Sequence, residues 1–133
     1  MKLSTEDRAR ILDLINLHGH LTDDGELDRL DELFADDVVY DVTDMGGGIL
    51  EGLPAVRDAA LALGAENPVA HHVTNVVLTL GKDGVVRAVS KGLGVKADGS
   101  VGSVTYEDVL VHHDHGWRIG RRTVRARRMP LTR

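Results

Sequence analysis

The chain has 133 residues, a formal net charge of −5 and no cysteine. This length fits a single domain, residues 1–133, and the acidic balance weighs against nucleic acid as a partner. The lack of cysteine excludes disulfides, thiol nucleophiles and zinc sites built on thiolates. No stretch approaches the roughly 20 apolar residues of a membrane span, and no signal peptide is recognisable. We therefore expect a cytoplasmic protein that makes no membrane contact.

The first part of the chain predicts a helix. Ser4 or Thr5 can cap it, and apolar residues follow at helical spacing from Ile11 to Leu17. We expect this helix to end at Gly19 or in the polar run Thr22–Gly25, because glycine weakens a helix and short polar residues favour turns.

Two further helices and one strand are predicted before residue 65. Apolar residues between Leu27 and Phe34 indicate a short second helix, and alternation over Val38–Thr43 indicates a strand. Gly46–Gly48 predicts a loop or a pocket rim. Pro54 suits the first turn of a third helix, which Gly64 would end.

From Pro68 onward the pattern becomes β-rich. Four segments are separated by turn signals at Gly81–Gly84, Ala97–Ser100 and Asp114–Gly116. Short connections of this kind predict an antiparallel meander. Three helices followed by such a meander predict an α+β domain, with the helices packed on one face of a curved, mostly antiparallel sheet.

Two residues far apart in the sequence are candidates for proton transfer. Asp23 follows the first predicted helix, and His71 begins the first strand of the meander. An imidazole held by a carboxylate is a general base near neutral pH, because the carboxylate fixes the ring tautomer and stabilises the imidazolium. The fold would have to bring the two residues together for this chemistry.

Taken together, these segments resemble the SnoaL-like branch of the nuclear transport factor 2-like superfamily. The resemblance rests on Asp23, Leu27–Leu30, Leu33–Tyr40, Glu51-Gly52, His71–Asn75, Tyr106–Leu110 and Gly116–Ile119. It implies a cone-shaped α+β barrel with a deep pocket between helices and sheet. It also implies a homodimer formed through the outer sheet face.

Within that superfamily, the chain is similar to the branch of scytalone dehydratase, bile acid 7α-dehydratase and hexachlorocyclohexane dehydrochlorinase. That similarity implies catalytic roles for Asp23 and His71 and an auxiliary proton donor at His18, where those enzymes carry Tyr or Lys. The base of ketosteroid isomerases would fall near Val42, which cannot serve. The second histidine of scytalone dehydratase would fall near Ser100–Ser103, where this chain has none.

The resemblance implies a lyase or isomerase of the dehydratase, isomerase or cyclase type. It would act on a hydrophobic oxygenated small molecule, such as a polyketide, steroid or terpenoid-like compound, without a metal or organic cofactor. Two alternatives stay open, because one scaffold can host unrelated functions. The chain could be a non-catalytic ligand-binding or dimerisation module, or a small structural subunit of a ring-hydroxylating oxygenase.

The candidate residues also have purely structural interpretations. Asp23 could cap the second helix, and His71 could be an ordinary core histidine. Strand alternation would place His71 with Val73, Asn75 and Val77 on one face and leave the neighbouring histidine, His72, on the other. Both faces are mostly apolar, so alternation alone does not choose between the two histidines.

Three other groups have simpler explanations than function. His112–His115 could form a zinc site, but their position beside a hairpin turn favours an exposed loop. The arginines of Arg121–Arg128 could bind nucleic acid, but a solvated strand face fits better with an acidic chain. Trp117 and Tyr106 are interpreted as packing residues.

Overall fold

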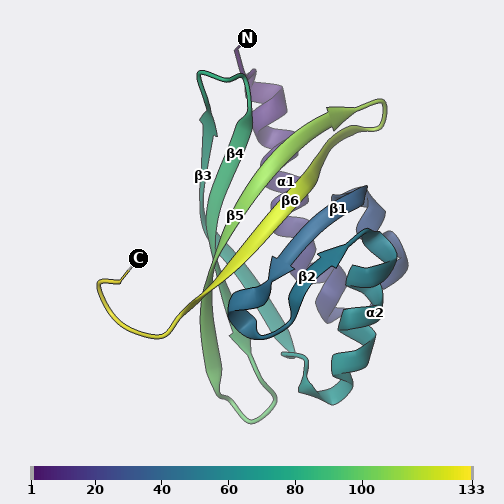
Figure 1. Cartoon of the computed structure of the whole chain (residues 1–133), viewed down its shortest axis with the longest axis vertical. Coiled ribbons are helices and arrows are strands. Elements are labelled where there is room, and N and C mark those ends of the chain that lie inside the picture. The colour runs from purple at the N-terminus through teal and green to yellow at the C-terminus, as the bar shows by residue number, and fades with distance from the viewer. Residues whose placement is uncertain (1, 133) are drawn as a thin grey trace.

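The computed structural model describes residues 2–132 and has the predicted α+β architecture (Figure 1). Helices pack against a curved six-stranded sheet with strand order β2-β1-β6-β5-β4-β3, so that within residues 2–132 the sheet stays open, with β2 and β3 at its edges. The elements in chain order are α1 (Thr5–Asp23), η1 (Leu27–Glu32), β1 (Phe34–Val42), η2 (Thr43–Met45), β2 (Gly48–Glu51), α2 (Leu53–Leu63), η3 (Gly64–Glu66), β3 (Ala70–Leu80), β4 (Val86–Val95), β5 (Val101–His113) and β6 (Gly116–Arg127).

The meander from β3 to β6 is antiparallel throughout, as its turn signals predict. β6 then pairs in parallel with β1, and β2 adds an antiparallel edge beyond it. This parallel pairing joins the N-terminal half of the chain to the end of the meander.

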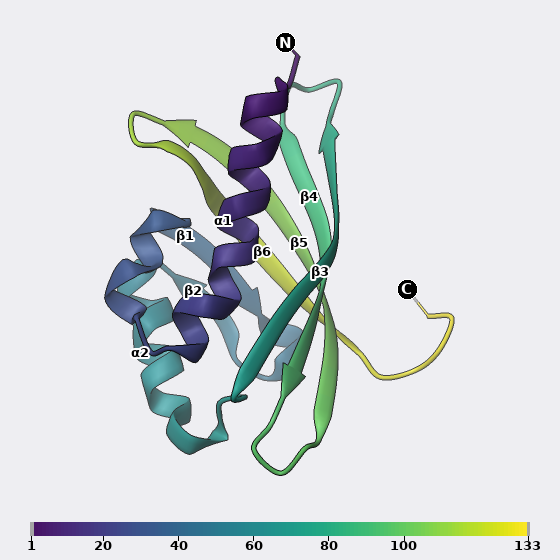
Figure 2. The same cartoon turned by 180° about the vertical axis from the view of Figure 1, so that it is seen from behind.

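Helix α1 lies across one face of the sheet (Figure 2). This is the inner face, and the opposite face is the outer face. It begins with a capping box, in which the Ser4 hydroxyl accepts a hydrogen bond from the Asp7 backbone N–H at 3.0 Å. Ile11 and Ile15 on its inner side are fully buried, and this burial holds the helix on the sheet. Within residues 2–132, neither α-helix is long and apolar enough to cross a lipid bilayer.

The stretch after α1 differs from the sequence-based expectation. The second helix is a 3-10 helix over Leu27–Glu32, and β1 begins at Phe34 rather than at Val38. Phe34 pairs with Ile119 of β6, so a long-range partner extends the strand into residues whose spacing looks helical. Gly46 and Gly47 form the expected loop, and Gly48 begins the short strand β2 (Gly48–Glu51), which the sequence did not indicate. Helix α2 starts within one residue of the prediction.

A β-bulge interrupts the alternation of β3. Asn75 has a φ of 57°, and the pairing with β4 shifts between Thr74 and Val77. His71 and Val73 are partly buried before the bulge, while Val77 beyond it is 57% exposed. The predicted grouping of His71 with Val77 is therefore wrong, because the extra residue reverses the facing of every later side chain.

Candidate active site

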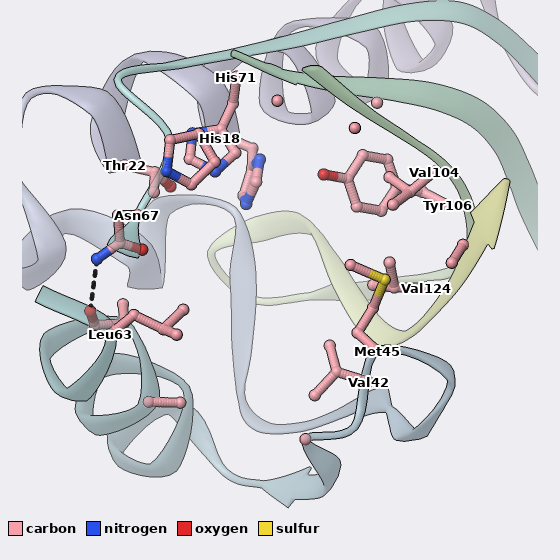
Figure 3. A pocket seen from close by; sticks show the side chains of 18 of the residues that line it. His18, Thr22, Val42, Met45, Leu63, Asn67, His71, Val104, Tyr106 and Val124 are labelled. Atoms are coloured by element: carbon pink, nitrogen blue, oxygen red, sulfur yellow. Dashed lines mark hydrogen bonds between the residues drawn. The ribbon is translucent and has the colours of Figure 1, made fainter. Parts of the chain in front are cut away.

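A cavity of about 980 Å³ lies between α1, η1, α2 and the inner face of the sheet (Figure 3). This volume is near the upper end of the range of about 300–1,000 Å³ found for small-molecule sites. The lining is mainly aliphatic and aromatic, which suits a hydrophobic ligand. Its uncharged polar side chains and imidazoles include His18, Thr22, Tyr40, Asn67, His71 and Tyr106.

The side chains of Asp23 and His71 meet at one end of this cavity. The Nδ1 atom of His71 lies 2.6 Å from Oδ1 of Asp23, and both carboxylate oxygens accept hydrogen bonds from the His71 backbone N–H at 3.0 Å. The His71 and Asp23 side chains are 17% and 23% exposed, respectively. A carboxylate is an acceptor only, so Nδ1 carries the proton in this contact and Nε2 is left free to accept one.

Asp23 does not cap the second helix. Helix η1 follows Glu26, and no side chain makes a capping hydrogen bond at its start. Asp24 ends α1, and its backbone N–H bonds to the His20 carbonyl. The Asp23 carboxylate instead makes three hydrogen bonds to a residue 48 positions away, which excludes the helix-capping interpretation of this side chain.

Gly19 allows α1 to approach β3 closely enough for this contact. A Cβ atom at Gly19 would lie only 2.3 Å from the backbone carbonyl oxygen of His71. The helix does not end at Gly19 but continues to Asp23, inside the polar run Thr22–Gly25 that was predicted as the other possible end. Glycine therefore serves close packing at this position, and one further helical turn carries Asp23 to the first residues of β3.

His18 lies one turn before Thr22 on α1 and lines the same cavity. Its ring is 5.8 Å from the His71 ring, centroid to centroid, in an edge-to-face arrangement. Burial, the positive charge of Arg122 and the neighbouring His71 hold the pKa of His18 well below its usual range. His18 is therefore neutral at pH 7, and any hydrogen bond that it gives comes from a neutral imidazole.

Arg122 and Asp108 form a buried ion pair beneath the cavity. Nε of Arg122 donates to Oδ1 of Asp108 at 2.7 Å and Nη2 donates to Oδ2 at 2.9 Å, and neither side chain has exposed surface. Although burial acts to lower it, the Asp108 carboxylate keeps the pKa of Arg122 above its ordinary value. The interpretation of Arg121–Arg128 as a solvated face is wrong for Arg122.

One sequence signal for this pair exists on β5. Asp108 alternates with Tyr106 and Leu110, both buried, and so occupies an inward position. The register irregularity between β5 and β6 near Leu110 hides the matching signal on β6, where Ile119 and Arg122 are both buried although they are three residues apart. Strict alternation would place one of those two residues outside.

The remaining candidates lie away from the cavity. His72 is exposed on the opposite side of β3. His112 and His113 are exposed at the end of β5, and within residues 2–132 no three potential metal-binding side chains come together. Trp117 packs in the core as expected, and its indole N–H donates to Oδ1 of Asp7 at 3.0 Å.

The profile of the SnoaL-like domain matches residues 4–123. The chain belongs to the SnoaL-like domain family. This assignment confirms the resemblance seen in the sequence. A comparison with curated proteins finds no significant match.

Solved structures similar to this SnoaL-like chain share its whole fold. A candidate aromatic ring hydroxylase from Novosphingobium aromaticivorans is 27% identical, with 98% of this chain and 95% of that chain covered and a TM-score of 0.75. A nuclear transport factor 2-like protein from the same species is 26% identical, with coverages of 96% and 84% and a TM-score of 0.71. Hexachlorocyclohexane dehydrochlorinase LinA-type3 from Novosphingobium barchaimii is 22% identical, with coverages of 97% and 95% and a TM-score of 0.76.

Proposed function

We propose that this protein is a cofactor-independent lyase or isomerase, with His71 as general acid/base and Asp23 as its orienting partner. The contact of 2.6 Å between Nδ1 of His71 and the Asp23 carboxylate, at the wall of an apolar cavity, carries the proposal. The chain's membership of the SnoaL-like family and the likeness of its fold to a dehydrochlorinase support a reaction of this class.

The proposed chemistry begins with proton abstraction next to a carbonyl group. Nε2 of His71 accepts the α-proton, and the electron pair of the broken C–H bond forms an enolate. For a β-hydroxy substrate, the enolate electrons then form the C=C bond as the C–O bond breaks, and the imidazolium returns its proton to the leaving hydroxide to give water. Return of the proton to another carbon instead gives isomerisation.

The lining of the cavity indicates the class of substrate. Its walls are mainly aliphatic and aromatic, so we expect the body of the substrate to be hydrophobic. His18 and His71 are polar groups in this wall, and the oxygenated part of the substrate would lie beside them. Polyketide, steroid or terpenoid-like carbonyl compounds have this combination. His18, which is neutral and adjacent to His71, would be an auxiliary hydrogen-bond donor to the substrate.

Proton exchange with solvent tests this proposal even when the product is not identified. A panel of hydrophobic β-hydroxy and unsaturated carbonyl compounds is incubated with the protein in D₂O and followed by NMR. We expect enzyme-dependent deuterium incorporation at the α or vinylogous carbon of at least one compound, or its dehydration or isomerisation. Tight binding of panel members without exchange or conversion would instead support a binding module.

A structural subunit of a ring-hydroxylating oxygenase is the second candidate, favoured by the 27% identity to a candidate aromatic ring hydroxylase. Purification from the native cells distinguishes the two. A stoichiometric complex with a larger oxygenase chain would support the subunit, whereas a free protein that catalyses exchange would support the enzyme.

We also propose that the protein is a homodimer joined through the outer face of the sheet. Val77 and Val89 are cross-strand partners on that face, and they are 57% and 43% exposed, while Leu93 nearby is 41% exposed. An exposed apolar group of this kind on β3 and β4 favours burial against a second copy. The predicted interface buries more than about 1,000 Å² in total.

Light scattering tests the dimer. We expect twice the chain mass of 14.4 kDa at micromolar concentration, and we expect Val89→Lys to shift the protein toward the monomer. Ala9→Lys, on the exposed side of α1 and away from the outer sheet face, is a control for the added charge. A wild-type protein that remains monomeric at this concentration would contradict the proposal.

A further inference from the structure

The Tyr106 hydroxyl has no function in packing. Tyr106 comes from β5 and is 5% exposed, and Figure 3 shows its hydroxyl pointing into the cavity toward the rings of His18 and His71. The rings of Tyr106 and His18 are 5.9 Å apart, centroid to centroid. The aromatic ring fills space in the core, but its hydroxyl group faces His18 and His71.

The ring of Tyr106 is held in place from two sides. A Cβ atom at Gly92 would lie 2.4 Å from Cε2 and 2.8 Å from Cζ of Tyr106, so only glycine leaves room for the ring against β4. Cζ of Arg122 lies 4.3 Å from the ring centroid, and Asp108 fixes the guanidinium through two hydrogen bonds. These contacts set the direction of the hydroxyl before any ligand binds.

The electrostatics of the site make this hydroxyl a permanent donor. Burial raises the pKa of Tyr106, although the charge of Arg122 opposes the rise, so the phenol keeps its proton at neutral pH. The guanidinium of Arg122 is attracted to the π-electrons of the ring, and this attraction holds the two groups together. The same cation stabilises the partial negative charge that grows on the phenol oxygen when its proton is shared.

We propose that Tyr106 donates a hydrogen bond to the substrate oxygen that gains negative charge when His71 removes the α-proton. The inference rests on the proposed function, and it assigns a catalytic role to a residue interpreted from the sequence as packing only. The donor is preorganised on a nearly buried side chain, and a preorganised donor aimed at the developing charge stabilises an enolate effectively. It also selects substrates whose carbonyl oxygen reaches Tyr106 while the α-carbon reaches His71.

The variant Tyr106→Phe tests the assignment because it keeps the ring, its packing on Gly92 and its stacking on Arg122. We expect kcat for a turned-over panel compound to fall by about 10²- to 10³-fold, the usual cost of losing one such donor, with KM changed by less than about threefold. Tyr40→Phe is the matched control. Tyr40 also lines the cavity, but its ring packs on Phe34, whereas the ring of Tyr106 packs on His18, so we expect a much smaller loss.

A binding probe separates this inference from the proposed activity. The naphtholate form of 6-cyano-2-naphthol mimics a flat enolate and has its own absorption band, and 2-cyanonaphthalene is its counterpart without the hydroxyl. We expect Tyr106→Phe to weaken binding of the naphthol by at least about tenfold and to reduce its bound naphtholate band, while binding of 2-cyanonaphthalene is unchanged.

Each outcome decides the assignment. Naphtholate binding that depends on Tyr106 supports it even if no panel compound is turned over, in which case only the proposed activity fails. Equal losses in Tyr106→Phe and Tyr40→Phe, equal losses for both probes, or no bound naphtholate in the wild type would overturn it. Turnover that survives Tyr106→Phe at the wild-type rate would also overturn it and leave the activity standing.

Discussion

His71→Ala is expected to lower the rate of the chemical step by about 10²- to 10⁴-fold, the usual contribution of general acid–base catalysis. The imidazole is the group whose Nδ1 is held by Asp23, and the variant leaves no base in its place. Single-turnover kinetics on a compound from the exchange panel measure the step directly. Deuterium exchange at the α-carbon and product formation both need proton abstraction by His71. In His71→Ala they should therefore fall by the same factor.

His72→Ala is the matched control for this variant. His72 is the next residue of β3, but its side chain is exposed on the other face, so the rate should change by less than about threefold. Both variants should remain folded, which circular dichroism can verify, because neither side chain supplies much apolar burial. A folded His71→Ala protein with the wild-type rate would show that His71 is not the base.

Asp23→Asn should also lower the rate severely, by about 10²- to 10⁴-fold. The carboxylate accepts from Nδ1 of His71 at 2.6 Å and from the His71 backbone N–H. An amide has only one acceptor oxygen, and its NH₂ group can donate to Nδ1 instead. Donation to Nδ1 places the ring proton on Nε2, where the base must be free.

Nitrogen-15 NMR of the His71 ring measures this change separately from catalysis. We expect the proton on Nδ1 in the wild type and a shift toward the Nε2–H tautomer in Asp23→Asn. Asp24→Asn is the matched control, because its residue ends α1 and does not contact His71. An Asp23→Asn protein with the wild-type tautomer and rate would remove Asp23 from the mechanism.

The geometry of the candidate site depends on fixed distances between elements that are remote in sequence. Asp23 closes a helix and His71 opens a strand, and Gly19 controls how near the two elements come. On the other side of the cavity, Gly92 and the Arg122–Asp108 pair fix Tyr106. Gly19 and Gly92 therefore adjust both sides of the candidate site, although neither has a side chain that could react.

The resemblance of several short segments to a known family identified the candidate pair, whereas hydrophobic periodicity did not. Alternation along β3 treated His71 and His72 as equivalent, and it failed beyond Asn75 because a bulge changes the facing of the strand. Residue type alone favoured a helix cap for Asp23 over a contact with His71. The choice between these interpretations needed the positions of α1 and β3 relative to each other.

The sequence by itself determined the α+β class, the antiparallel meander with its three turns, and α2. These features follow from local signals, since turn residues and hydrophobic spacing act over a few positions. Only the tertiary structure decided the contact of Asp23 with His71, the burial of Arg122 on Asp108 and the direction of the Tyr106 hydroxyl. Each of these depends on strand register and on helix packing, which long-range contacts establish and which a one-residue bulge can reverse.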